Sequence, residues 1–240
     1  MSGLFFNLGR KLGLAAVPAL RKSKWLWQSV AGNEADSVRA ETQFGRALAA
    51  ELRARCGDRS DSAGMQLVAG IGERLGQALR HEVRTFQVET MRGGTPNAMA
   101  LPGGFIFVDV ALLDLCERNP DELAFVIGHE MAHVVRRHTF DRVLRKVGVQ
   151  MITTLLGRGA LGLWLRKSGM DLLRSAHSQD IELEADEMGA DMAASAGFDP
   201  EGAMSLLKRL QALRSGPEGV GEYFGSHPPE RLRMAHLKAR

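Results

Sequence analysis

The most constraining feature of this 240-residue chain is the pentapeptide His129-Glu130-Met131-Ala132-His133, in which two histidines stand four residues apart. On an α-helix, positions i and i+4 lie on one face about 6 Å apart, so the two imidazoles can bind one metal ion. In such a motif zinc lowers the pKa of a water to about 7, and the glutamate accepts its proton. The pentapeptide therefore predicts His129 and His133 as metal ligands and Glu130 as a general base.

The residues around the pentapeptide predict that it lies inside a buried helix. Asn119 suits the N-cap position, Pro120 suits N1 and Glu122 suits N3, and the helix is expected to run to about Arg137. The pentapeptide is flanked by four aliphatic residues, Val126, Ile127, Val134 and Val135. Unpartnered histidines are costly in such surroundings. A metal site is therefore favoured over two ordinary surface histidines.

A catalytic zinc site needs a third protein ligand, and residues 182–186 contain a candidate pair. Glu182 and Asp186 are again four residues apart on an expected helix, so both carboxylates face the same way. One of them can bind zinc while the other accepts a hydrogen bond from a ligating histidine. Glu184 points elsewhere on the helix and is expected to be solvated.

Helical spacing and turn residues predict helices first, then a small β element, then mostly helices. We expect helices over 37–55 and 65–79, strands over 82–88 and 105–108, a turn over 92–97, a helix ending near Gly197, and another opening at Asp199-Pro200-Glu201. This order is typical of an α+β fold. No long linker interrupts it, which predicts one domain over residues 37–240 after an N-terminal arm over residues 1–36.

Charge and cysteine content exclude several classes of protein. Residues 1–30 carry five basic side chains and no acidic one, whereas the remainder has a net charge of −2, which argues against nucleic acid as a partner. Cys56 and Cys116 are the only cysteines, so a disulfide framework and a cysteine-based zinc cluster are excluded. The basic and aromatic arm either contacts a membrane surface peripherally or folds over the domain as a solvated segment.

A second apolar stretch, residues 147–165, is long enough to span a bilayer but carries Arg158 near its middle. A central arginine costs about 2.5–3.5 kcal/mol on insertion scales. We therefore expect a buried or surface-docked helix here. The corresponding expectation for localisation is a cytoplasmic protein, peripheral to the inner membrane, with a periplasmic or membrane-anchored protein as the alternative.

An ordered series of motifs between about residue 97 and residue 233 resembles the zinc metallopeptidases that include the HtpX heat-shock protease and the CAAX prenyl protease. The motifs are residues 97–108, 121–130, 178–186 and 226–229, followed by Arg233. The resemblance implies a mainly helical α+β domain of the zincin type, with a small sheet or hairpin beside the active-site helix. It also implies one zinc ion per chain.

The same resemblance implies roles for individual residues. It assigns zinc ligation to Glu182 and a supporting role to Asp186. It implies that His227 approaches the zinc or the substrate, and that Arg233 stabilises the oxyanion. The strand that binds the substrate would consist of Asn97, Ala98, Met99 and Ala100.

The leading hypothesis is a zinc metalloendopeptidase, a hydrolase that cleaves peptide bonds in unfolded or extended polypeptides with a metal-activated water. Its alternative is a latent or non-proteolytic zinc-binding chaperone or scaffold at a membrane surface, with the metal site capped by His227. A zinc hydrolase that acts on a small substrate is a weaker third option.

Overall fold

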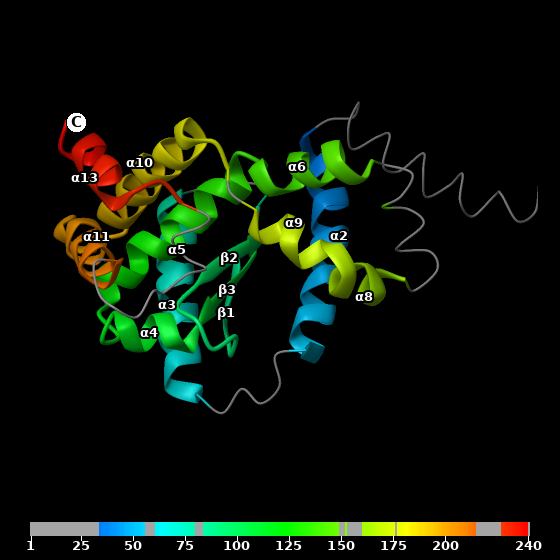
Figure 1. Cartoon of the computed structure of the whole chain (residues 1–240), viewed down its shortest axis with the longest axis horizontal. Helices are drawn as coiled ribbons and strands as arrows, with labels where there is room; N and C mark the ends of the chain where they lie inside the picture. Colours follow the sequence, from blue (N-terminus) through cyan, green and yellow to red (C-terminus); the bar gives the residue numbers. More distant parts are fainter. Residues whose placement is uncertain are drawn as a thin grey trace, which may run out of the picture.

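A three-stranded sheet lies between two groups of helices in the computed structural model, which describes residues 34–55, 61–79, 84–148, 152, 160–175, 177–214 and 227–239 (Figure 1). The strands are β1 (Gln87–Met91), β2 (Ala98–Leu101) and β3 (Phe105–Asp109). One group of helices comprises α3 (Ser62–Leu79), α4 (Val110–Leu115), α5 (Pro120–Val135), α10 (Gln179–Ser195), α11 (Glu201–Arg214) and α13 (Glu230–Lys238). The other comprises α2 (Glu34–Arg55), α6 (His138–Val147), α8 (Leu161–Trp164), the π-helical turn η1 (Leu165–Gly169) and α9 (Met170–Arg174).

The strand order is β1-β3-β2, with β1 parallel and β2 antiparallel to β3. Strands β2 and β3 form a hairpin, and β2 is an edge strand that lies beside the helix α5. The expected α+β class, mainly helical with a small sheet beside the helix that carries the pentapeptide, is confirmed.

Alternate side chains of the sheet enter two different hydrophobic cores. Ala98, Ala100, Ile106 and Val108 pack into the core built by α3, α5, α10 and α11. Met99, Leu101, Phe105 and Phe107 pack into the core built by α2, α6, α8 and α9. Because neighbouring strand residues point to opposite faces, a sheet covered on both faces needs apolar residues at every position. This explains the unbroken apolar run Phe105-Ile106-Phe107-Val108.

Helix α5 begins as the sequence predicts, because the side chain of Asn119 accepts hydrogen bonds from the N–H groups of Asp121 and Glu122. It ends at Val135, two residues before the expected end, since Arg137 adopts a left-handed conformation with φ 59°. Glu122 does not cap the helix N-terminus. Its buried carboxylate reaches across to Ser205 and Arg209 on α11.

Helices α5 and α10 touch through backbone at Gly128 and Gly189. A Cβ atom at Gly128 would lie 2.7 Å from the carbonyl oxygen of Gly189, and one at Gly189 would lie 2.6 Å from the backbone nitrogen of His129. Only glycine fits at both positions, because real Cβ atoms do not approach other atoms this closely. The contact brings the pentapeptide helix against the helix that carries Glu182 and Asp186.

Glu41 on α2 joins three parts of the fold at a buried position. Its carboxylate accepts two hydrogen bonds from Arg84, each 3.1 Å long, and a third from the N–H of Gly103 in the β2–β3 turn. The guanidinium of Arg137, at the junction of α5 and α6, lies 3.6 Å from the same carboxylate. Helix α2 therefore contacts both the hairpin turn and the end of α5 through this one carboxylate.

Two sequence expectations differ from the structure or fall outside it. A strand was expected over 82–88, whereas β1 spans Gln87–Met91 because that segment pairs with the whole of β3. The basic arm lies outside the described residues up to position 33, and so does most of the apolar stretch 147–165. The division into an arm and a domain stays a prediction.

We predict that Gly128→Ala destabilises the protein by about 1–3 kcal/mol, because the added methyl group overpacks the backbone contact between α5 and α10. Chemical denaturation monitored by circular dichroism measures the effect. Gly70→Ala is the matched control, since Gly70 is exposed on α3 and a Cβ atom there would meet nothing within 4 Å. The control should gain up to about 1 kcal/mol. Equal effects of the two substitutions would contradict the close contact.

Candidate metal centre

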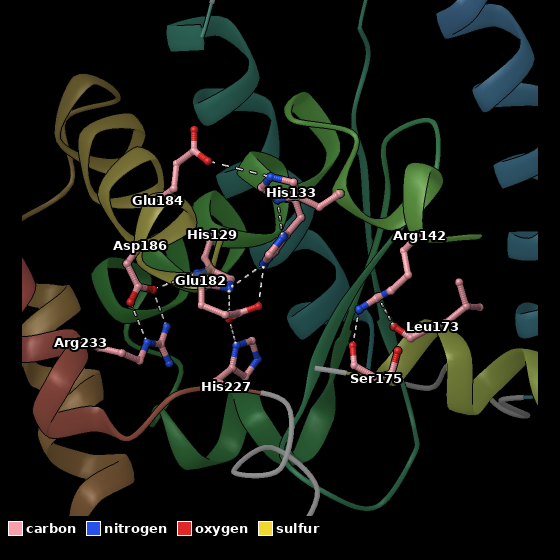
Figure 2. A network of polar contacts seen from close by, with 11 residues as sticks. His129, His133, Arg142, Leu173, Ser175, Glu182, Glu184, Asp186, His227 and Arg233 are labelled. Carbon is pink, nitrogen blue, oxygen red and sulfur yellow. Dashed lines mark hydrogen bonds and ion pairs between the residues drawn. The ribbon is translucent and has the colours of Figure 1, made fainter. Parts of the chain in front are cut away.

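Two helices bring three potential metal ligands together (Figure 2). On α5, the Nε2 atoms of His129 and His133 lie 3.1 Å apart. From α10, one oxygen of Glu182 lies 3.5 Å from His129 Nε2, and the other lies 3.5 Å from His133 Nε2. All three side chains are buried. The face of α5 that carries the two histidines therefore meets the face of α10 that carries Glu182, as the i, i+4 spacings predict.

These three residues fit a zinc ion. Two nitrogens bound tetrahedrally at 2.0–2.1 Å from zinc would lie about 3.3 Å apart, close to the separation of the two imidazoles. Glu182 Oε1 is buried and accepts no hydrogen bond from any residue that the structure describes. A buried carboxylate oxygen without a donor is costly unless a cation satisfies it. Two imidazoles and a carboxylate are also a common ligand set of catalytic zinc.

The protonation states of two of the ligands, His133 and Glu182, suit a cation. Burial lowers the pKa of His133 well below its ordinary value, and the neighbouring His129 lowers it further, so His133 is neutral. Burial by itself would raise the pKa of Glu182, but hydrogen bonds from His129 and His227 outweigh it and hold the pKa far below its usual range. A neutral imidazole and an ionised carboxylate are the metal-binding forms of these groups.

Asp186 supports the first histidine from behind. Its carboxylate lies 2.9 Å from His129 Nδ1 and accepts hydrogen bonds of 2.6 and 2.7 Å from Arg233 (Figure 2). Burial opposes the ionisation of Asp186, yet Arg233 and His129 together lower its pKa. Burial lowers the pKa of His129, but its bonds to Asp186 and Glu182 outweigh this and raise the pKa to about 9.

The structure places Arg233 beside Asp186. It was expected to stabilise an oxyanion, but its side chain is only 1% exposed and its guanidinium forms the ion pair with Asp186. The group also lies against the ring of Phe125, 5.9 Å from the ring centre. In this position Arg233 contacts Asp186, which in turn contacts His129.

Glu130, the expected general base, is buried beside the ligands. One of its oxygens forms a group with ligand atoms of His129 and His227, in which all three atoms lie within 4.8 Å of one another. Burial raises the pKa of its carboxyl, whereas His129, His227 and a hydrogen bond from the Ala100 N–H act in the opposite direction. The carboxylate therefore faces the ligand cluster and is held by the edge strand.

His227 lies close to the metal ligands. Its Nδ1 atom is in hydrogen-bond contact with Glu182 Oε2, and its ring centre is 5.1 Å from that of His129 (Figure 2). The residue precedes α13, the helix that carries Arg233. The segment before α13 thus reaches the centre through the carboxylate of Glu182.

The expected substrate strand, Asn97 to Ala100, includes most of β2. The Asn97 carbonyl accepts a 2.8 Å hydrogen bond from the N–H of Asp109 at the end of β3. Hydrogen-bonding direction alternates along an antiparallel pair, so Met99 also bonds to β3, and Ala98 and Ala100 direct their N–H and C=O groups to the outer edge. The bond from the Ala100 N–H to Glu130 agrees with this direction.

Two further histidines surround His133, and the sequence analysis missed both. His138 Nδ1 lies 2.9 Å from His133 Nδ1, and the ring of His177 stacks on that of His133 with centres 4.6 Å apart. Burial lowers the pKa of His138, and burial together with Arg142 lowers that of His177 to about 3. His138 could have been found from the sequence, because it lies only five residues after His133. Nothing in the sequence pattern indicates the contact of His177 with His133.

Residues 65–240 match the sequence profile of Peptidase family M48. The chain belongs to peptidase family M48. Members of this family are zinc-dependent metallopeptidases, which agrees with the ligand set. The expected resemblance to a family of zinc metallopeptidases is thereby confirmed.

Three relatives of this M48 chain are named proteases. Mitochondrial metalloendopeptidase OMA1 of Schizosaccharomyces pombe is 31% identical over 158 residues, which cover 64% of this chain and 46% of OMA1. Metalloprotease LoiP of Escherichia coli is 30% identical over 150 residues, which cover 60% of this chain and 58% of LoiP. The β-barrel assembly-enhancing protease of Escherichia coli is 25% identical over 218 residues, which cover 85% of this chain and 44% of that protein.

The M48 chain spans about half the length of these relatives. None of these three relatives is named as an HtpX or CAAX prenyl protease, so the narrower part of the resemblance is not confirmed. Among the described residues, every helix is too short or too polar to cross a membrane.

We predict that zinc stabilises the wild-type chain and that Glu182→Gln loses most of this effect, because the amide removes the anionic ligand. An ion that binds only the folded state adds about 4 kcal/mol when its free concentration exceeds Kd a thousandfold. Calorimetric unfolding with zinc and with a chelator measures the difference. Asp180→Asn, at an exposed position of α10, is the control and should keep the full rise. An undiminished rise in Glu182→Gln would contradict the ligand assignment.

Proposed function

We propose that this chain is a zinc-dependent endopeptidase that hydrolyses peptide bonds with an activated water. The observation that carries the proposal is the convergence of His129, His133 and Glu182 on one point, with the Glu130 carboxylate in the same buried cluster. Membership of family M48, and relatives named as metalloendopeptidases, support it.

Three of the four residues would hold the metal in the proposed reaction, and the fourth would transfer protons. His129, His133 and Glu182 would hold the zinc, whose Lewis acidity lowers the pKa of water to about 7 and polarises a peptide carbonyl. Glu130 would accept the proton of the attacking water and deliver it to the leaving amine. The Ala100 N–H orients Glu130 for this transfer.

The residues around this group would orient it. Asp186 and Arg233 would fix the ring of His129 through the hydrogen bonds described above. His227 would contact either the metal or the oxyanion of the substrate, since it lies within reach of the ligand cluster. We propose Arg233 as a positioning residue in place of an oxyanion-binding one, because its guanidinium is bound to Asp186.

Glu130→Gln should lower the cleavage rate of an unfolded, casein-like protein by about 10²–10⁴-fold, because an amide cannot accept the proton of water. Zinc content, measured by elemental analysis, should stay at one ion per chain. Glu73→Gln, an exposed change on α3, should cleave at the wild-type rate. Full activity of Glu130→Gln would show that another group is the base.

The outer edge of β2 supports an extended polypeptide as the substrate. Ala98 and Ala100 direct main-chain groups to that edge, beside Glu130, and the small side chains let α5 lie against the strand. A peptide that adds to a sheet edge bonds through its own main chain, which gives affinity without a demanding sequence. Unfolded or extended segments would meet this requirement.

A scan of N-methyl groups along a cleaved peptide tests the added strand. Methylation should lower kcat/KM about tenfold at every second amide, because alternate N–H groups of an added strand point to β2. Alanine substitutions at the same positions, which keep the N–H groups, serve as controls. Equal sensitivity at adjacent amides, or none, would contradict strand addition.

The contact of His227 with Glu182 supports a second candidate, a latent or non-proteolytic zinc protein. In such a protein His227 would cover the position that water and substrate need. Zinc-loaded wild type without cleavage, together with cleavage by His227→Ala, would identify a latent peptidase. Zinc binding without cleavage by either protein would identify a binding role. The proposed membrane contact of residues 1–30 applies to both candidates.

A further inference from the structure

We propose that His138 is a positioning residue for the metal centre. Its ring accepts a hydrogen bond from His133 and so fixes the orientation of the His133 ring, which would bind the metal. The inference rests on the proposed zinc site. Its central observation is the 2.9 Å separation between the Nδ1 atoms of the two histidines. Their ring centres are 5.1 Å apart, with the ring planes at 69°, so the rings meet through these nitrogens and do not stack.

The direction of this hydrogen bond follows from the metal site. Because His133 presents Nε2 to His129 and Glu182, a bound ion takes the lone pair of Nε2, and the proton of the neutral ring is on Nδ1. His133 Nδ1 therefore donates. His138 Nδ1 accepts, which requires that the proton of His138 lie on Nε2.

A carboxylate favours that tautomer of His138. Its Nε2 atom faces Glu184 Oε2 at 4.0 Å, and the other oxygen of Glu184 lies 2.7 Å from Arg136 Nη2. A negative charge in this direction stabilises the N–H of Nε2 over the alternative tautomer. Glu184, which was expected only to be solvated, is 40% exposed and forms the outer end of this arrangement.

Each of the two ligand histidines thus contacts a second side chain, which in turn contacts a charged group. The second side chain is an anion for His129 and a neutral ring for His133. His129 contacts the buried anion Asp186, which contacts Arg233. His133 contacts the neutral ring of His138, which faces Glu184, and Glu184 pairs with Arg136. Partners of this kind orient ligating imidazoles and raise their basicity, and their loss lowers metal affinity about 10–100-fold in other proteins.

The local backbone explains how His138 reaches His133. A residue five positions further along an uninterrupted helix would point away from the ligand face. Here α5 ends at Val135, and Arg137, with φ 59° and ψ 18°, turns the chain before α6 begins at His138. The ion pair of Arg137 with Glu41 holds this turn.

Substitutions at His138 test the inference through metal binding. His138→Leu removes the acceptor and should weaken zinc affinity about 10–100-fold in a chelator competition assay. His138→Asn, whose Oδ1 can take the place of Nδ1, should restore affinity to within about threefold of the wild type. The absorption spectrum of the cobalt-substituted protein should change in His138→Leu and return toward the wild type in His138→Asn. His236→Leu, on α13, is the matched control.

Nitrogen-15 NMR of the zinc-loaded wild type tests the same inference without any substitution. We expect His133 to be protonated at Nδ1, and His138 at Nε2 only. Protonation of His138 at Nδ1, or wild-type zinc affinity in His138→Leu, would overturn the positioning role. The proposed function fails separately, if the wild type binds no zinc or if His133→Ala binds it as tightly as the wild type.

Discussion

The backbone contact between α5 and α10 sets the spacing on which the metal centre depends. Gly128 precedes His129, and Gly189 lies on the same face of α10 as Glu182 and Asp186, two turns after Glu182 and one turn after Asp186. At a larger separation of the helix axes, Glu182 could not reach both imidazoles, and Asp186 could not bond to His129. Two residues without side chains therefore determine the geometry of those that carry the chemistry.

The sheet contributes to the centre by holding Glu130, and this also depends on small residues that allow a helix to pack closely. Alanines at 98 and 100 let α5 lie against β2, so that the Ala100 N–H reaches the carboxylate of Glu130. The larger residues of β2, Met99 and Leu101, enter the opposite core and fasten the strand to α2 and α6. Glu130 and the strand proposed to bind the substrate are thus held in place by the same packing of α5 against β2.

The sequence predicts the parts of this centre that depend on periodicity and local capping. Asn119 and Pro120 start the helix, and the i, i+4 rule places His129 with His133 and Glu182 with Asp186. The choice of Glu182 as the ligand required the family resemblance, because spacing treats the two carboxylates alike. The position of Arg233 behind Asp186 and the contact of His138 with His133 depend on tertiary packing and on one left-handed residue, Arg137, neither of which periodicity reveals.

Helix α2 lies before the residues that match the M48 profile, which begin at residue 65, yet it lines one of the two cores and carries Glu41. If α2 were removed, the guanidinium of Arg84 would lose its carboxylate, the hairpin turn at Gly103 would lose its acceptor, and the apolar side chains of this core would be exposed to water. The boundary of the family match is therefore not the boundary of the folding unit. We therefore expect an excised M48 domain of this chain to fold only if it includes α2 from its first residues.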